Sequence, residues 1–226
     1  MKKILSRLIF VLLAAGLLAQ SPPPARTPGS DQTPAPKTFQ EYHPPGAKGG
    51  PMVLVSDFKF YIDKYEVTNQ DYQECVAAGV CKKRKSGKHF DAPEQPMVGV
   101  INQNYARTFC QWAGKRLPKD QEWQEAGQGT DGRMYPWGND PPNCNLANYQ
   151  YCKIGRTLPV GSKPAGASPY GAMDMAGNVW ELVEEWGVYR GGGWGSLETF
   201  LILLRRYPDF ARGSEFGFRC ARDGSP

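Results

Sequence analysis

The sequence contains only two histidines, His43 and His89, and no Cys-x-x-Cys pair. Zinc sites are built from closely spaced cysteines and imidazoles, so this composition excludes a conventional zinc centre. The same shortage of histidine excludes a Ser-His-Asp hydrolase, and no glycine-rich phosphate loop is present. Glu184 and Glu185 are neighbours in sequence, as expected of solvated charges rather than of a catalytic carboxylate pair.

Long hydrophobic runs are also absent, apart from one short stretch near the N-terminus. A basic head with Lys2, Lys3 and Arg7 precedes an apolar run over residues 8–18. This pattern is typical of a secretory signal peptide, and the run is shorter than the roughly 20 residues that span a bilayer. We therefore expect residues 1–19 to be a signal peptide of a secreted or periplasmic protein of the cell envelope, with no stable membrane span after cleavage.

The charge balance gives no case for a nucleic-acid partner. The net charge of +5 comes from 27 basic and 22 acidic residues, and three of the basic residues lie in the expected signal peptide. The cleaved chain therefore carries +2, which is too little to attract nucleic acid or an acidic membrane strongly. The basic cluster at residues 82–85 is expected to be a solvated loop.

A change of composition marks the expected domain boundary. Residues 20–51 are rich in Pro, Ala and Gly, contain few aromatic residues and show no apolar periodicity. Such a segment cannot bury enough surface to offset the entropy of folding, so we expect a semi-extended tether. Residues 52–226 are long enough for one domain with its own core.

Six cysteines in an exported chain indicate disulfides, because the compartments outside the cytosol are oxidising. Six cysteines allow 15 pairings, and close spacing favours two local bridges. If both form, one long bridge remains, so the expected pairs are Cys75–Cys81, Cys144–Cys152 and Cys110–Cys220. The long bridge would close a loop of about 110 residues, which the chain-entropy model values at about 4–5 kcal/mol.

Local patterns predict one strand and three helices in the first half of the domain. Apolar and polar residues alternate over residues 58–63, which is typical of a strand. Caps and helical spacing of apolar side chains predict helices over residues 70–78, 102–113 and 119–126, each ending at a glycine. Beyond them, frequent Gly, Pro, Asn and Asp between aromatic residues predict a loop-rich region with an aromatic core. Residues 200–204 are either a buried strand or an exposed ligand patch.

An ordered set of short motifs carries a family resemblance. The motifs are FYIDKYEVTN at residues 60–69, CQWAGKRLP at 110–118, EW at 122–123, YPWG at 135–138, ANY at 147–149, DMAGNVWE at 174–181, RGG at 190–192 and GFRC at 217–220. Together they resemble the formylglycine-generating enzyme, or sulfatase-modifying factor, family across residues 52–222. The resemblance implies an α+β fold of the formylglycine-generating-enzyme type, related to C-type lectins and poor in regular secondary structure.

The positions that carry catalysis in this family are changed here. Active members oxidise a cysteine of a sulfatase to formylglycine with copper held by two cysteines, and those positions correspond to Ser196 and Leu201. A hydroxyl and an alkyl group supply neither the thiolates that Cu(I) prefers nor a partner for thiol exchange. The serine of the family's Gly-Gly-Ser turn is Gly193, and a nearby asparagine is Glu215. The resemblance therefore implies that no copper is bound and that the family's oxidase chemistry is lost.

The resemblance also bears on the disulfides and on calcium. It supports Cys110–Cys220 as the long bridge and places a second family bridge at about Gly127 and Arg206, where both cysteines are missing. A structural calcium site is implied by residues 174–181, because carboxylates and backbone carbonyls in a glycine-containing turn suit this cation. Its ligands would be the side chains of Asp174 and Glu181 and the carbonyls of Gly177 and Val179. A less complete site would use Asn148 and the Tyr149 carbonyl.

Three functions remain open from the sequence. The first is a pseudoenzyme, a non-catalytic binding or scaffolding module whose old substrate groove recognises an unknown protein or glycan at the cell envelope. The groove residues would be Trp180, Trp194, Ser196, Glu198, Phe200, Arg205 and Arg206. The second is a divergent oxidoreductase that needs a metal site from a partner, because neither histidine is placed to hold iron. The third is a diversified, lectin-like ligand-binding protein with residues 194–214 as its variable stretch.

Overall fold

The computed structural model describes residues 39–84, 87–99, 102–208 and 214–224. The expected signal peptide, and residues 20–38 of the expected tether, lie outside the described residues. Within the described ranges, no helix is both long enough and apolar enough to cross a membrane.

Residues 39–51 belong to the folded domain, which corrects the expected boundary at Met52. Tyr42 forms an antiparallel bridge with Met52 through two 2.8 Å backbone hydrogen bonds. Phe39 packs so closely on Gly171 that a Cβ at Gly171 would lie 2.3 Å from the ring. The composition of this segment misled the prediction because a few aromatic anchors are enough to hold an irregular segment on a packed surface.

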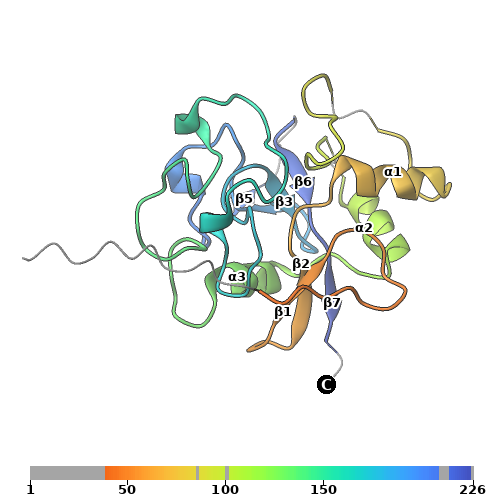
Figure 1. Cartoon of the computed structure of the whole chain (residues 1–226), viewed down its shortest axis with the longest axis horizontal. Helices are drawn as coiled ribbons and strands as arrows, with labels where there is room; N and C mark the ends of the chain where they lie inside the picture. The colour runs from red at the N-terminus through yellow and green to blue at the C-terminus, as the bar shows by residue number, and fades with distance from the viewer. Residues whose placement is uncertain (1–38, 85–86, 100–101, 209–213, 225–226) are drawn as a thin grey trace, which may run out of the picture. The chain divides into compact units, whose positions relative to one another are not determined.

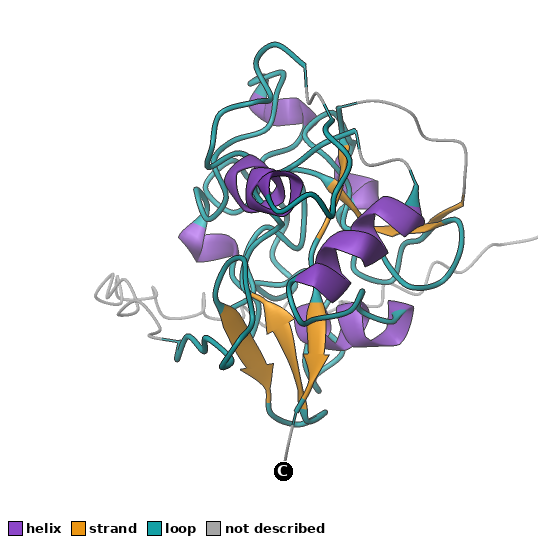
Figure 2. Cartoon of the chain, turned by 90° about the vertical axis from the view of Figure 1, so that its right-hand side faces the viewer, coloured by secondary structure: helices purple, strands orange, loops and turns teal. Residues whose placement is uncertain are grey.

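The two ends of the domain meet in a three-stranded antiparallel sheet (Figure 2). β1 (Met52–Val55) pairs with β2 (Phe60–Asp63), and β2 pairs with β7 (Ala221–Asp223). The strand predicted over residues 58–63 is confirmed from Phe60 to Asp63, so it begins two residues later than predicted. Lys59, at φ 60°, lies in the turn that joins β1 to β2.

Three helices follow close to their predicted positions (Figure 1). α1 (Asn69–Ala77) begins at a capping box in which the Thr68 hydroxyl and the Asp71 backbone and side chain bond reciprocally. α2 (Gln103–Trp112) is capped by the side chain of Asn102 and contacts α1. The caps are local in sequence, so these boundaries were predictable to within one residue.

The third helix, α3 (Asp120–Gln128), runs through Gly127, so its predicted end was wrong. A Cβ at Gly127 would lie 2.6 Å from the Leu203 side chain, which shows that this glycine serves a close packing contact. The helix ends at Gly129, whose φ of 68° is unfavourable for other residues.

The second half of the domain is built around a small mixed sheet in the order β5-β4-β3-β6. β3 (Trp180–Leu182) lies parallel to β6 (Phe216–Phe218) and antiparallel to β4 (Val188–Arg190), which pairs with β5 (Tyr207–Pro208). Between α3 and β3 the chain forms long loops that contain only two short 3-10 helices, Gln150–Cys152 and Pro164–Gly166 (Figure 1). The predicted loop-rich character of this region is confirmed.

All six cysteines are paired, in the arrangement that spacing and the resemblance favoured: Cys75–Cys81, Cys110–Cys220 and Cys144–Cys152. The long bridge joins α2 to the residue before β7 and lies in the main aromatic core. There the Phe109 ring packs 5.6 Å from Phe218 and 5.8 Å from Tyr72. This disulfide therefore links α2 covalently to the segment that leads into β7.

Candidate functional site

The loop that follows β4 carries the two positions expected to be catalytic in the family. Ser196 is 7% exposed, and its hydroxyl accepts a 2.9 Å hydrogen bond from the Gly193 backbone N–H. The Ser196 N–H in turn donates to the Gly193 carbonyl at 2.9 Å. Leu201 is fully buried in a cluster with Tyr135 and Tyr149. Ser196 therefore closes a tight turn, and Leu201 is part of the core.

Glu215 lies against the glycines of the same turn. A Cβ at Gly195 would be 2.5 Å from Glu215 Oε1, and one at Gly193 would be 3.1 Å from Oε2. Burial raises the pKa of the Glu215 carboxyl, and a hydrogen bond from the Gly195 backbone opposes that rise. The half-buried carboxylate of Glu215 therefore lies directly against the backbone of Gly193 and Gly195.

Two tryptophans expected in the groove, Trp180 and Trp194, differ in how far they are buried. Trp180 is buried, which corrects its expected place on the groove surface, and its ring packs against Phe200 at 5.8 Å and Tyr207 at 5.2 Å. Trp194 is half-buried, and its indole N–H donates to the Ser214 carbonyl at 3.3 Å. The Trp194 ring lies 6.0 Å from Phe90. Trp180 supports the surface from beneath, whereas Trp194 forms part of it.

Residues 200–204 form neither a strand nor a continuous exposed patch, so both predictions were wrong. Phe200 ends a 3-10 helix (Glu198–Phe200), and Leu201 and Leu203 are buried. Only Leu204 is strongly exposed, at 60%. The exposed and half-buried side chains of residues 194–207 define a surface that we call the groove rim. Its residues are Trp194, Leu197, Glu198, Phe200, Leu204, Arg205 and Tyr207.

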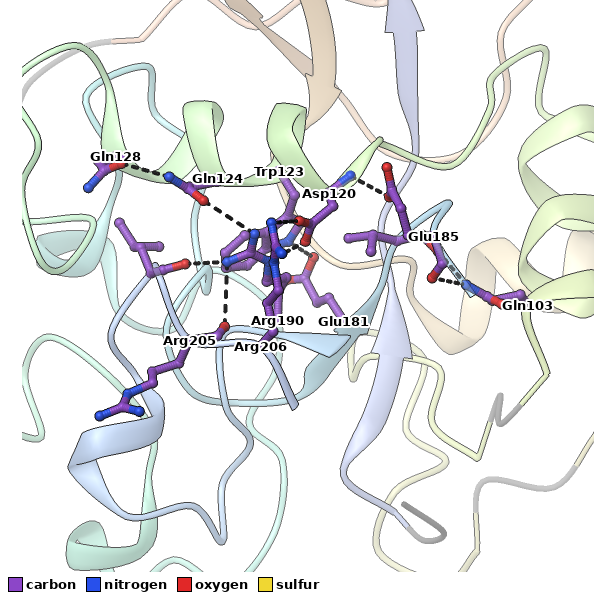
Figure 3. Close-up of polar contacts among 12 residues, drawn as sticks. Gln103, Asp120, Trp123, Gln124, Gln128, Glu181, Glu185, Arg190, Arg205 and Arg206 are labelled. Atoms are coloured by element: carbon purple, nitrogen blue, oxygen red, sulfur yellow. Dashed lines mark hydrogen bonds and ion pairs between the residues drawn. The ribbon is translucent and has the colours of Figure 1, made fainter. Parts of the chain in front are cut away.

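A buried arginine ties α3 to the groove rim (Figure 3). The Arg190 guanidinium is fully buried and donates to Asp120 Oδ1 at 2.5 Å and to the Leu203 carbonyl at 2.7 Å. Arg206 pairs with the other oxygen of Asp120, and its side chain remains 62% exposed. These contacts join the same two regions that a disulfide at Gly127 and Arg206 would join in the family.

The residues of the expected calcium site are buried, but one carboxylate is already engaged. Glu181 accepts two 2.7 Å hydrogen bonds from the Arg219 guanidinium and a third from the Trp123 indole. Arg219 also donates to the carbonyls of Asp63, Lys64 and Met173. Glu181 therefore acts first as the partner of a buried arginine.

A second carboxylate, which the sequence analysis missed, lies near Asp174. Glu66 is buried, accepts from the Asn178 side chain at 3.0 Å through Oε1, and leaves Oε2 without a partner. Asp174 accepts from the Gly161 N–H at 2.6 Å. Burial raises the pKa of Asp174 to about 6, and burial with the nearby charge of Asp174 raises that of Glu66. In the sequence Glu66 is one of three charged residues in the 60–69 motif, and nothing local singles it out.

The residues of the two expected calcium sites are in direct contact. Gly177, at φ 88°, passes so close to Asn148 that a Cβ would lie 2.4 Å from the Asn148 carbonyl oxygen. The Asn178 N–H donates to that carbonyl at 2.8 Å, and Asn148 Oδ1 has no partner. Across the described ranges, no three His, Cys, Asp or Glu side chains converge as a metal site. A cation held here would need backbone and amide oxygens besides Asp174 and Glu66.

Comparisons with known proteins identify the family of this chain. The family model of the sulfatase-modifying factor enzyme 1-like domain matches residues 24–224. The serine/threonine-protein kinase pkn1 of Chlamydia caviae is 34% identical over 209 residues, which cover 72% of this chain and 33% of that protein. The inactive C-alpha-formylglycine-generating enzyme 2 of Bos taurus is 36% identical over 153 residues, which cover 57% of this chain and 50% of that protein.

A solved structure agrees as well. PvdO from Pseudomonas aeruginosa aligns with a TM-score of 0.58 at 25% identity, over 73% of this chain and 80% of that one. The fold is the expected loop-rich α+β fold of the formylglycine-generating-enzyme type, related to C-type lectins. The chain spans a third to a half of the two curated relatives, so their activities as whole proteins are not transferred to it. On the family match over residues 24–224, the chain belongs to the sulfatase-modifying factor enzyme 1-like domain family.

Proposed function

We propose that this chain is an exported, non-catalytic binding module that recognises a protein or glycan at the cell envelope through its groove rim. The observation that carries the proposal is the state of the two former catalytic positions. The Ser196 hydroxyl is used to close a turn, and Leu201 is buried. Every cysteine is in a disulfide, so no thiolate can bind copper or attack a substrate.

The groove rim has the composition of a recognition surface. Leu197, Leu204 and Tyr207 are exposed hydrophobic residues, and the half-buried Phe200 ring packs 6.1 Å from the Tyr207 ring. Exposed apolar groups that are neighbours on a rigid base favour binding of a partner. The base is rigid because Arg190 and Asp120 fix the segment to α3 (Figure 3). The similarity to a relative named as inactive also supports a role without catalysis.

The compartment is part of the proposal. Three disulfides in a domain of this size are expected where thiols are oxidised, which supports export by the N-terminal segment. We expect the mature chain to begin near residue 20.

A capture experiment tests the groove rim. The mature chain is immobilised and exposed to a cell-envelope extract, together with the variants Leu204→Asp and Tyr207→Asp. Each variant is expected to reduce capture of the specific partner about tenfold, because a charge replaces buried apolar contact in the complex. The matched control is Leu54→Asp on β1, where the leucine is 43% exposed and distant in sequence from the rim. Equal loss in the control, or no loss in either rim variant, would remove the rim as the binding surface.

The proposal includes a structural calcium ion beside Asp174 and Glu66. In support, the buried carboxylates of Glu66, Asp174 and Glu181 all act electrostatically on one buried guanidinium, that of Arg219, and Glu181 bonds it directly. The unpartnered Glu66 Oε2 and the backbone near Gly177 add oxygen atoms of the kind that calcium prefers. The ion would neutralise excess negative charge and hold the 174–181 loop in place.

The pH dependence of stability tests this site. In chelator, Asp174 has a folded-state pKa of about 6 against an ordinary value of 3.8, so the folded state holds a proton that the unfolded state has lost. The free energy of unfolding should therefore fall as pH rises from about 4 to 7, by up to about 3 kcal/mol from this group. Calcium should restore the loss at pH 7 and have little effect at pH 4.

Urea unfolding at several pH values, with calcium or with chelator, measures both effects. The Asp174→Asn variant should weaken the pH dependence, because it removes one of two neighbouring carboxyl groups whose pKa is raised, and it should abolish the calcium response. A stability that rises over the same pH range in chelator, or a calcium effect that survives in Asp174→Asn, would contradict the assignment.

A further inference from the structure

The carboxylate of Glu215 occupies a slot made by two glycines. Its Oε1 would lie 2.5 Å from a Cβ at Gly195, and its Oε2 would lie 3.1 Å from a Cβ at Gly193. Only a residue without a side chain can stand at Gly195 while the carboxylate keeps this position. The backbone also fixes Glu215 from the other side, because its carbonyl accepts a 2.6 Å hydrogen bond from the Trp180 N–H. The slot therefore holds the carboxylate in one place at the groove rim.

This carboxylate has no cationic partner within the described part of the protein. None of the ion pairs formed there includes Glu215. The more deeply buried carboxylates differ, since Asp63 pairs with Lys115, Asp120 with Arg190 and Glu181 with Arg219. Among the described residues the Glu215 carboxylate accepts a hydrogen bond from the Gly195 backbone but meets no cation, so a cation from the ligand would stabilise its charge.

The turn that forms the slot also carries an indole ring. Trp194 stands between the two glycines in sequence, and its indole N–H donates to the carbonyl of Ser214, the residue before Glu215. The ring is therefore held along the backbone that carries the carboxylate, and Phe90 lies 6.0 Å beyond it. A carboxylate beside an indole attracts organic cations, because the charge and the ring quadrupole both favour positive charge.

We propose that Glu215 and Trp194 form a site for an organic cation, an ammonium or guanidinium group presented by the ligand of the groove rim. The inference rests on the proposed function, since the rim supplies the surrounding contacts. A calcium ion fits this slot less well, because one carboxylate offers too few oxygens for six- to eightfold coordination. The group is carried either by a free amine or by a lysine or arginine side chain of a polypeptide.

Nuclear magnetic resonance on the mature chain tests the site through the Trp194 indole N–H signal, assigned with a Trp194→Phe variant. The probes are the N-acetylated and C-amidated peptide Gly-Lys-Gly, its neutral analogue Gly-norleucine-Gly with the same blocked ends, cadaverine and calcium chloride. The lysine peptide should shift the signal saturably and bind at least about tenfold more tightly than the neutral analogue. Because the Trp194 backbone N–H bonds the Asn178 carbonyl of the proposed calcium loop, all samples contain saturating calcium chloride from the start, and further calcium should not shift the signal. A cadaverine affinity equal to that of the peptide would support the site with a free amine as its source, and a weaker one would support it with a polypeptide.

Two charge-removing variants separate this site from the rest of the rim. Glu215→Gln should weaken lysine-peptide binding about tenfold, whereas Glu198→Gln, an exposed glutamate of the same rim, should change it less than about twofold. Equal binding by Glu215→Gln, or an equal shift with the neutral peptide or with calcium, would overturn the cation site. If Glu215→Gln still captured the envelope partner fully while Leu204→Asp did not, the binding surface would stand and the cation site alone would fail.

Discussion

Replacing Arg219 with methionine is expected to destabilise the domain by about 3–5 kcal/mol, a large part of the stability of a typical domain. The guanidinium is fully buried and bonds both oxygens of Glu181 at 2.7 Å. Its removal would leave Glu181 buried without its cation, close to the carboxylates of Glu66 and Asp174. Urea unfolding followed by tryptophan fluorescence measures the change.

Two further variants make this result interpretable. Arg116→Met removes a partly exposed guanidinium that pairs with Glu122 and Asp223, so it should cost at most about 1 kcal/mol. Arg219→Lys keeps the charge but loses the planar fork, and it should give an intermediate loss. If Arg219→Met were no more destabilising than Arg116→Met, the buried charge cluster would not be central to the fold.

Removing the long disulfide with the double variant Cys110→Ala/Cys220→Ala is expected to cost about 4–5 kcal/mol. The two cysteines are 110 residues apart, and opening so large a loop restores much chain entropy to the unfolded state. Both sulfurs are also in the core between α2 and β7, so their loss removes packing as well. Thermal unfolding of the purified variant in non-reducing buffer provides the measurement.

The short bridge is the matched control. Cys144 and Cys152 are eight residues apart, and the same chain-entropy relation values their bridge at about 2–3 kcal/mol. We expect Cys144→Ala/Cys152→Ala to unfold at a clearly higher temperature than the long-bridge variant. The reverse order would mean that loop closure does not determine how these bridges stabilise the domain.

Features with local causes were predictable from the sequence. The ends of α1 and α2 follow from their caps at Thr68 and Asn102, and the cysteine pairing follows from spacing and from the ordered motifs. The positions of Ser196 and Leu201 also follow from the motif order. These predictions depend on residues close together in the sequence. The exception is the long disulfide, which was predicted because the two short disulfides use the other four cysteines.

Features with distant causes were not predictable in the same way. Gly127 does not end α3, because Leu203 packs on it from a segment 76 residues later. Glu181 pairs with Arg219, and Asp120 pairs with Arg206. No local sequence pattern indicates either ion pair. Residues 39–51 have the composition of a tether, and only their contacts with the rest of the domain show that they belong to it.

The groove turn illustrates both cases. The sequence shows a glycine at position 193 and a glutamate at position 215, but it does not show that they touch. In the structure the carboxylate of Glu215 lies against the backbone of Gly193 and Gly195. The turn thus places a half-buried carboxylate at a partly apolar surface. This arrangement is consistent with the proposed recognition function.

The measurement that tests the central claim most directly is copper-dependent oxygen consumption with a cysteine peptide of the sulfatase motif. The mature chain is incubated with Cu(I), and the peptide is analysed by mass spectrometry for conversion of its cysteine to formylglycine. With Ser196 in a turn, Leu201 in the core and every cysteine in a disulfide, we predict no oxygen uptake above the protein-free control and no converted peptide. Copper-dependent turnover that yields formylglycine would contradict the account of a non-catalytic binding module.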